Sequence, residues 1–265
     1  MAIIDQQIQF DPDKLNTRVV GIAAEIGQHD SGMHQHKQGQ LLFAPQGCMS
    51  FALDNAICIL PPTKAVWIPP STQHRAMMTN VVAYRSLYFD CSVFNCPKDI
   101  ITIDVNALLK ALIDKMALWQ WDKPEDEMCN TTALFWEEFY AATRHSFQLP
   151  LPSNRRFKPF REQLMQDCFL VPDLTSVANS VGASTKTVTR LFKAETGMSY
   201  QDWRHQWRLL KAIELLSREM QVSNVAHWLG FSSDSAFIAF FKKQTGLTPL
   251  NFMKNNAVTL NILSK

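Results

Sequence analysis

The spacing of apolar residues changes along the chain. Up to about residue 104, short apolar runs alternate with turn residues, and pairs of prolines end two of the runs. Many short strands at close spacing are typical of a β-barrel or a β-sandwich. We expect strands at Leu41–Pro45, Cys48–Leu53, Ala56–Leu60, Ala65–Ile68, His74–Met78 and Val81–Phe89.

From Val105 the apolar residues recur with a helical period. The pattern predicts an amphipathic helix to about Gln120 and a second helix after a break at Asp122 to Asp126. One apolar face on each helix fits either a cover over the barrel or a contact with a second chain, and the pattern leaves both open. The candidates for a dimer contact are Leu108, Leu112, Met116 and Trp119.

Residues 148–159 read QLPLPSNRRFKP, which combines three prolines with two adjacent arginines. This composition is typical of an exposed linker. It separates residues 1–147 from residues 160–265, where the apolar pattern is helical throughout. The predicted fold class is therefore α+β, with a β-barrel and a helical pair followed by an all-α domain.

The helical part contains an internal repeat. With Phe192 set over Phe241, the stretch STKTVTRLFKAETGMS aligns with SDSAFIAFFKKQTGLT. An Ala-x-x-x-Gly spacing precedes each copy, at Ala178–Gly182 and Ala226–Gly230. Small residues at these positions allow a close helix approach and a tight turn, which predicts two helix–turn–helix units. The breaker-free stretch Ser199–Ser217 predicts one helix that links them.

Residues 160–255 resemble the DNA-binding domain of AraC/XylS-type transcription regulators. The resemblance rests on RLFKAETGMSYQDW, WRLLKAIELL and GFSSDSAFIAFFKKQTGLTP. It implies sequence-specific binding of double-stranded DNA at an operator. The chain departs from the family at Asn251–Met253, where an aromatic residue followed by Arg is usual.

The first repeat is expected to read the DNA sequence. Its recognition helix, from about Thr185 to Glu195, buries an apolar stripe, so its polar residues face outward. The resemblance implies that Lys186, Thr189 and Arg190 contact bases. An arginine reads guanine through two parallel hydrogen bonds, whereas Lys193 is expected to meet phosphate.

The second repeat is expected to hold the DNA with little sequence preference. The matching positions are Ser235, Ile238 and Ala239, and none of them carries a guanidinium group. Apolar side chains reach a thymine methyl but form no bidentate pair. Lys242 and the helix N-terminus are expected to hold phosphates.

Three histidines and a glutamine mark a candidate effector site in the barrel. His34 and His36 stand two residues apart, so that their side chains share one face of an extended segment. The spacing His34-x-His36-x3-Gln40, followed later by Pro69-x-Ser71-x2-His74, resembles the two cupin motifs. There a Glu usually stands in place of Gln40, and Gly in place of Ser71.

Three interpretations of the histidines remain open. His34, His36 and His74 could hold a divalent transition metal such as Zn, Ni, Cu or Fe. Alternatively, together with Gln40 and Trp67 they line a metal-free pocket for a small-molecule effector, since barrel mouths are common ligand sites. Trp67 is either a wall of that pocket or a core residue, and the core is the commoner place for a single aromatic residue. In the third interpretation they lie on the surface near strand ends.

Charge separates the two halves of the chain. Residues 1–150 carry 11 Lys and Arg against 16 Asp and Glu, whereas residues 151–265 carry 15 against 8. Either only the second half meets a polyanion, or the imbalance reflects drift in surface charge, and the charge count leaves both open. Scattered cysteines, no signal peptide and no apolar segment long enough to span a bilayer predict a cytoplasmic protein with no membrane partner.

The sequence favours a ligand-responsive transcription regulator that is not an enzyme and that pairs as a homodimer. One alternative is a metal-dependent cupin enzyme with a DNA-binding appendage. Such an enzyme would need an acid or base near the metal, where the sequence offers Gln40. A second alternative is a DNA-binding protein whose barrel senses nothing.

Overall fold

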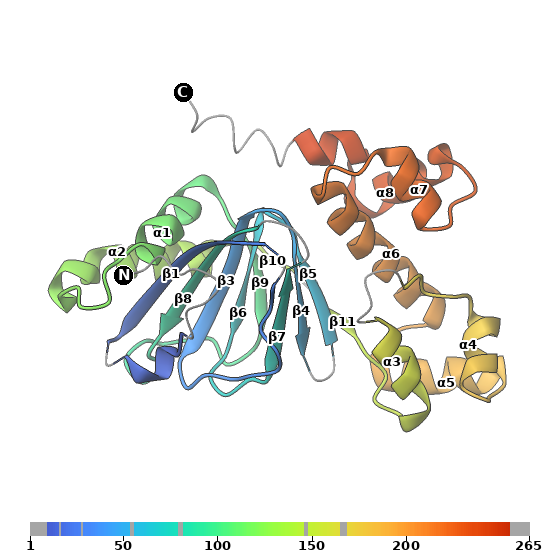
Figure 1. The fold of residues 1–265 in the computed structure, drawn as a ribbon, viewed down its shortest axis with the longest axis horizontal. Helices are drawn as coiled ribbons and strands as arrows, with labels where there is room; N and C mark the ends of the chain where they lie inside the picture. The colour runs from blue at the N-terminus through green and yellow to red at the C-terminus, as the bar shows by residue number, and fades with distance from the viewer. Residues whose placement is uncertain are drawn as a thin grey trace. The chain divides into compact units, whose positions relative to one another are not determined.

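The computed structural model describes residues 10–15, 17–27, 29–53, 56–78, 82–145, 148–164 and 169–254. These residues divide into two compact units, one of residues 10–53 and 59–145 and one of residues 56–58 and 148–254. The first unit is rich in strands and the second is helical, which confirms the predicted α+β class (Figure 1).

The strands are β1 Val19–Ile26, β2 His29–Asp30, β3 Gly39–Gln46, β4 Met49–Leu53, β5 Ala56–Leu60, β6 Lys64–Ile68, β7 His74–Met78, β8 Val82–Phe89, β9 Ile101–Asp104, β10 Arg144–His145 and β11 Gln148–Pro150. The helices are α1 Ala107–Ala117, α2 Glu125–Ala141, α3 Lys158–Leu164, α4 Leu174–Ser180, α5 Thr185–Thr196, α6 Tyr200–Ser217, α7 Val222–Trp228 and α8 Asp234–Thr245, with short 3-10 turns at Pro12–Lys14 and Arg155–Phe157.

Within the described residues the strands form two sheets, in the orders β1-β8-β3-β6-β9-β10 and β11-β5-β4-β7-β2. The described part of each predicted strand is present, with its ends shifted by two residues or fewer, and Val81 lies outside the described residues. β1 was not predicted. It pairs antiparallel with β8 over its whole length, from Val19 opposite Phe89 to Ile26 opposite Val82.

Helices α1 and α2 cover the outer face of the first sheet (Figure 1). Leu112, Met116 and Trp119 are buried in the core between helices and sheet, together with Phe43 and Phe89. These three candidates for a dimer contact are therefore core residues, because the apolar face of α1 packs against the sheet. Leu108, the fourth candidate, is 46% exposed.

The amino end of the predicted linker is ordered. Residues Gln148–Pro150 form β11, which pairs antiparallel with β5. Leu149 and Leu151 are buried, and the Trp203 indole Nε1 donates to the Pro150 carbonyl over 2.6 Å. An indole that reaches a backbone carbonyl in this way fixes the segment to α6.

In the helical unit α6 follows α5 and leads to α7 and α8, as the repeat predicted (Figure 1). Ser199 caps α6 by accepting from the Asp202 N–H. The core of the unit consists of large aromatic side chains, among them Phe192, Trp203 and Phe241, which are fully buried. No described helix is both long and apolar enough to span a bilayer.

Candidate functional site

α5 is a well-capped helix that presents the predicted reading residues to the outside. Ser184 caps its N-terminus by accepting from the Thr187 N–H, and Gly197 ends it in the left-handed region at φ 73°. Val188 and Phe192 are buried beneath it. The helix is thus fixed at both ends and along its inner face.

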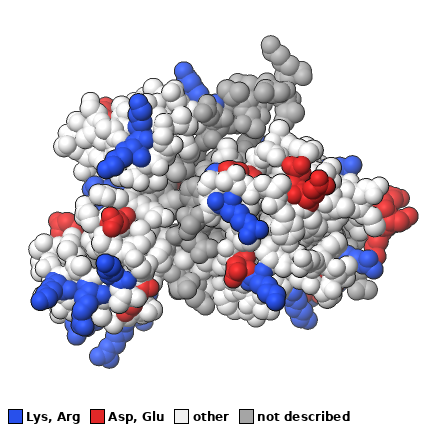
Figure 2. All heavy atoms as spheres, turned by 180° about the vertical axis from the view of Figure 1, so that it is seen from behind, with Lys and Arg blue, Asp and Glu red and all other residues white. Residues whose placement is uncertain are grey.

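The side chains on the outer face of α5 differ in exposure and in which of their hydrogen-bonding groups are unoccupied. Lys186, Arg190 and Lys193 are exposed. Thr189 is half-buried, and its Oγ1 already donates to the Thr185 carbonyl over 2.8 Å, so that only the oxygen lone pairs are left for a base. In Figure 2, Lys and Arg side chains gather over the end of the helical unit that carries α3, α4 and α5. The basic side chains at this end of the helical unit suit contact with a DNA phosphate backbone.

α8 repeats the geometry of α5 with a different outer face. Ser233 caps it by accepting from the Ala236 N–H, and Gly246 ends it at φ 78°. Ser235 and Ala239 are exposed and Ile238 is half-buried, while Lys242 is exposed in the last turn. Over the positions that match the reading residues of α5, this face offers one hydroxyl and no charge.

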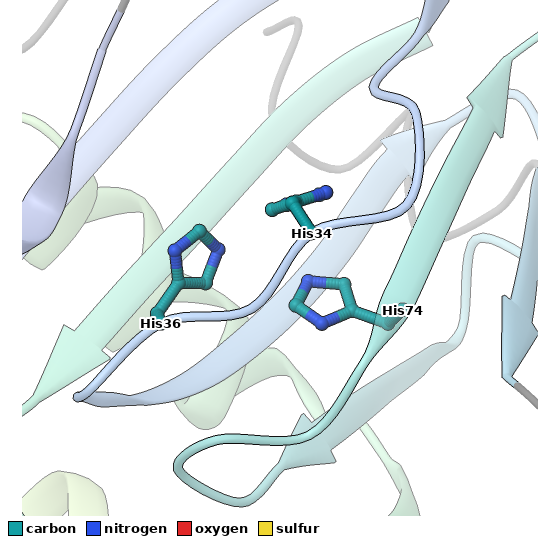
Figure 3. Close-up of side chains that lie close together, drawn as sticks. All are labelled: His34, His36 and His74. Atoms are coloured by element: carbon teal, nitrogen blue, oxygen red, sulfur yellow. The ribbon is translucent and has the colours of Figure 1, made fainter.

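The three histidines come together in the barrel, as one interpretation of the sequence required. His34 and His36 lie on the connection between β2 and β3, and His74 begins β7 (Figure 3). Ring centroids are 4.8 Å apart for His34 and His36, and 4.4 Å apart for His34 and His74. One nitrogen from each ring can be chosen so that all three lie within 4.8 Å of one another.

Backbone hydrogen bonds hold this arrangement. His34 and His74 form an isolated antiparallel bridge, in which each N–H donates to the other's carbonyl over 2.9 Å. The Ser71 N–H donates to the His36 carbonyl over 2.7 Å, and Ser71 adopts φ 58°. Left-handed backbone favours glycine, which explains why cupin motifs prefer Gly at this position.

Hydrogen bonds to backbone carbonyls fix the tautomer of two imidazoles, those of His34 and His74, and leave Nε2 of each ring without a proton. His34 Nδ1 lies 2.9 Å from the Gly32 carbonyl and His74 Nδ1 lies 2.8 Å from the Thr72 carbonyl, so both nitrogens donate. In a neutral ring Nε2 then keeps its lone pair. This pattern, with a backbone carbonyl fixing the other ring nitrogen, is the usual support of metal-binding histidines.

Burial keeps the inner part of the cluster neutral. Desolvation, and to a smaller extent the neighbouring His34, lower the pKa of His36 and of His74 to about 4. His36 Nε2 is buried and has no hydrogen-bond partner among the described residues. Neutral imidazoles with unoccupied nitrogens are the form that binds a metal or a hydrogen-bond donor.

The barrel wall beside the cluster is polar, and the sequence analysis missed most of it. Gln40 is 2% exposed, and its Nε2 donates to Ser86 Oγ over 2.9 Å and to Tyr88 Oη over 2.8 Å. The Tyr88 ring lies 5.2 Å from that of His36. Ser86 and Tyr88 stand at alternate positions of β8, a signal that the sequence contains and that places them on one face.

Trp67 does not belong to this site, which corrects the sequence interpretation. It pairs opposite Leu41 on β3 and packs with Phe89 and Trp136 beneath α2. Its Nε1 donates to the Pro97 carbonyl. Gln40 faces the barrel interior, so its neighbour Leu41, and Trp67 with it, face the opposite side of the sheet.

Comparisons with known proteins agree with the two units. An AraC-like ligand binding domain matches residues 16–120, and a helix-turn-helix domain matches residues 177–255. The HTH-type transcriptional regulator NimR of Escherichia coli (strain K12) is 28% identical over 243 residues, which are 91% of this chain and 89% of that protein.

Other similar proteins align with a shorter part of the chain or have a lower sequence identity. The arabinose operon regulatory protein of Escherichia coli (strain K12) is 36% identical over 81 residues, 30% of this chain and 28% of that protein. A crystal structure of ToxT from Vibrio cholerae O395 covers 89% of this chain and 95% of its own at 10% identity, with a TM-score of 0.37, too low to carry an argument. The matches to both domains and along nearly all of NimR show that this chain belongs to the AraC family of transcription regulators, with a ligand-binding domain and a helix–turn–helix DNA-binding domain.

Proposed function

We propose that this regulator responds to an effector that binds at His34, His36 and His74 in the barrel. The single observation that carries the proposal is the convergence of three imidazoles whose chosen nitrogens lie within 4.8 Å of one another. A buried group of polar atoms without partners costs free energy unless a ligand satisfies it. Binding at this place therefore gives the ligand-binding domain its signal.

A divalent transition metal ion is the first occupant that we propose. Nitrogens bound to one tetrahedral ion lie roughly 3.4 Å apart, because each metal–nitrogen bond is about 2.1 Å long. Binding such an ion would draw the three nitrogens together from their present separations of up to 4.8 Å. A set of imidazoles with no carboxylate suits Zn, Ni, Cu or Fe.

A small organic effector is the second occupant, and the wall around Gln40 favours it. Gln40 Oε1 is buried and has no partner among the described residues, so it is free to accept from a ligand. Desolvation raises the pKa of Tyr88 well above its usual value, which keeps its hydroxyl protonated at pH 7. The site thus offers hydrogen-bond acceptors to a polar molecule that carries donors.

We propose that the chain is not an enzyme. The described residues around the cluster supply histidines alone as candidate metal ligands. Asp30, the acidic residue nearest to the motif in sequence, is paired with Arg75, whose hydrogen bond lowers the pKa of that carboxyl to about 2. A carboxylate with so low a pKa is a weak general base at neutral pH.

We further propose that α5 reads the operator through Lys186, Thr189 and Arg190, with Lys193 on phosphate. α8 holds the adjacent DNA through Lys242 and touches it with Ser235, Ile238 and Ala239. The exposure of the charged residues of α5 favours this division. A cytoplasmic homodimer is the state in which we expect the protein to act, since most regulators bind paired half-sites.

The test of the sensor proposal uses the full chain and an operator selected from a random DNA library. Titration calorimetry with Zn²⁺, Ni²⁺ and Cu²⁺ is expected to show one tight site, and the bound metal to change operator affinity. His74→Ala is expected to weaken metal binding roughly 100-fold or more, since losing only a residue that hydrogen-bonds to a ligand costs about 10–100-fold. His29→Ala removes a histidine of β2 outside the cluster and serves as the control.

Two outcomes separate the occupants. If no metal binds but a member of a small-molecule panel raises the melting temperature of the wild type and of His29→Ala, and not of His74→Ala, the effector is organic. If both variants respond like the wild type to every metal and molecule that binds, the histidine cluster is not the sensor.

A further inference from the structure

A pair of cysteines lies on the loop that follows β8. Cys91 and Cys96 are five residues apart in the sequence, and both side chains are half-buried. The Cys96 thiol donates a hydrogen bond to Cys91 Sγ, so the two sulfur atoms are neighbours. The function proposed above uses neither of them, and both are separate from the histidine cluster.

Contacts on either side hold this loop in place. Phe94, which stands between the two cysteines, packs against the core of the first unit. The Tyr140 hydroxyl of α2 donates to the Asn95 carbonyl. The Trp67 indole Nε1 donates to the Pro97 carbonyl over 3.0 Å. Because the backbone around the pair is fixed, the two thiols meet without a further ordering of the chain.

The surroundings of Cys91 favour its thiolate. The hydrogen bond from the Cys96 thiol lowers the pKa of Cys91, and a bond from the Gly39 backbone N–H lowers it as well. Burial and the Asp90 carboxylate act in the opposite direction but do not cancel these bonds. The thiolate is the nucleophilic form of cysteine, so Cys91 is the member of the pair that is prepared to react.

Cys96 has the opposite character. Its role as the donor to Cys91 raises its pKa, and burial raises it further. Cys96 therefore keeps its proton while its sulfur rests against Cys91. An accessible thiol of low pKa beside a second, resolving thiol is the arrangement found in cysteines that respond to oxidants.

Metal binding does not account for the pair. Structural zinc sites use four ligands. Among the residues that the structure describes, the histidine cluster is the one group of three or more potential metal ligands. The chemistry left to two adjacent thiols is oxidation to a disulfide.

We propose that Cys91 and Cys96 form a reversible redox site, in which a peroxide oxidises Cys91 and Cys96 then closes a disulfide. This site is independent of the proposed sensor and of the DNA-reading helix.

The step balances with hydrogen peroxide as the oxidant. The Cys91 thiolate attacks one peroxide oxygen, so that an S–O bond forms, the O–O bond breaks, and the leaving hydroxide takes up a proton to become water. The Cys96 sulfur then attacks the sulfenic sulfur of Cys91. An S–S bond forms, and the sulfenic oxygen leaves as a second water with the Cys96 proton. Two thiols are oxidised and one peroxide is reduced.

Peptide mapping of the full-length wild type tests the disulfide. Trypsin cuts after Arg85 and Lys98, so both cysteines fall in one peptide, residues 86–98. After treatment with hydrogen peroxide and then iodoacetamide, this peptide is expected to be lighter by about 2 Da than the reduced peptide and to carry no alkyl group. A dithiol is expected to restore both alkylation sites.

The exposed Cys129 is the internal control. Its thiol donates to the Glu125 carbonyl over 3.1 Å. At the peroxide dose that closes the pair, Cys129 is expected to remain open to iodoacetamide, because exposure alone does not activate a thiol.

Three variants test the roles of the two cysteines. Cys96→Ser keeps a hydrogen-bond donor beside Cys91 but cannot close the disulfide, so peroxide is expected to leave a sulfenic acid at Cys91 that dimedone traps. Cys91→Ser is expected to give about tenfold less dimedone adduct, at Cys96, since that thiol keeps its proton. Cys129→Ser is the matched control and is expected to form the disulfide as the wild type does.

Three results would overturn the proposal. In the first, residues 86–98 still carry two alkyl groups at a peroxide dose that oxidises Cys129. In the second, disulfides form only between chains. In the third, the Cys91→Ser and Cys96→Ser variants give equal amounts of dimedone adduct, which would remove the difference between the two thiols. The first two results come from the wild type and do not depend on the folding of a variant.

Discussion

The two helix–turn–helix units share several details of their internal framework. Before each recognition helix a glycine sits in the left-handed region, Gly182 at φ 63° and Gly230 at φ 70°. After each helix the backbone N–H of the closing glycine donates to a lysine carbonyl, that of Lys193 or of Lys242.

The threonine before each closing glycine repeats the same pair of contacts. Thr196 Oγ1 donates to the Phe192 carbonyl and accepts from the Met198 N–H. Thr245 repeats this with Phe241 and Leu247. The repeat thus extends to single side-chain hydrogen bonds.

The outer faces of the same two helices have little in common. α5 presents Lys186 and Arg190 where α8 presents Ser235 and Ala239. Framework residues are constrained by packing and caps, whereas outward residues are constrained only by what they bind. The comparison shows that a duplicated framework can carry two different outer faces, and we propose that the face of α5 reads DNA whereas that of α8 holds it.

The largest expected effect tests whether the two frameworks are equally important for stability. Phe192 and Phe241 are both fully buried. Phe192→Ala and Phe241→Ala are each expected to lower the free energy of unfolding of the helical unit by about 3–5 kcal/mol, because each leaves a cavity. Urea unfolding with hydrogen exchange of the α5 and α8 amides measures both. A loss of unfolding free energy under about 1 kcal/mol in only one of the two variants would show that the two frameworks are not equally important for stability.

The next largest loss of stability is expected from replacing the glycine that ends each recognition helix. Gly197 and Gly246 lie at φ 73° and 78°, and a Cβ added to either would meet no atom within 4 Å. Alanine there costs only the strain of the left-handed backbone, about 1–2 kcal/mol. Thermal melts of Gly197→Ala and Gly246→Ala are expected to shift by similar amounts. A neutral substitution in either copy would contradict the shared helix end.

The smallest expected loss of stability comes from removing the threonine hydrogen bonds that the two copies share. Thr196→Val and Thr245→Val keep the shape and remove a hydroxyl that both donates and accepts. Each is expected to cost about 1 kcal/mol, the net value of an intramolecular hydrogen bond. Thr187→Val, on the half-buried side of α5 near its start, is the comparison for a hydroxyl outside this motif. A null result in both copies would make the shared contact incidental.

Local patterns made most of the framework predictable from the sequence. A serine just before a helix is a local capping signal, and Ser184 and Ser233 both accept from the backbone N–H three residues on. Alternation of apolar runs gave the strands from β3 to β8. Such signals depend on neighbours in sequence, so they are readable without the fold.

The misses depend on contacts between distant segments. β1 contains Gly21, where an added Cβ would lie 2.0 Å from the Met116 carbonyl oxygen. That glycine makes sense only once α1 is packed on the strand. The sequence left Trp67 open as a pocket wall or a core residue, because a one-residue difference in register decides which face of the sheet it takes.

The candidate site was half predictable for the same reason. The spacing of His34 and His36 fixed their shared face, and the motif resemblance supplied His74. Ser86 and Tyr88 complete the wall from β8, a strand 46 and 48 residues beyond Gln40 in sequence. Nothing local connects them to the histidines, although their alternation along the strand is visible.

The proposed division, in which α5 reads the operator and α8 holds the adjacent DNA, can be tested through base preferences. Selection from a random DNA library gives the base preferences of the wild type, of Arg190→Ala and of Ala239→Ser. We predict that Arg190→Ala loses discrimination at one guanine position by about 1–3 kcal/mol, and that Ala239→Ser keeps the wild-type profile. Equal losses in the two variants, or a loss in Ala239→Ser alone, would contradict the account.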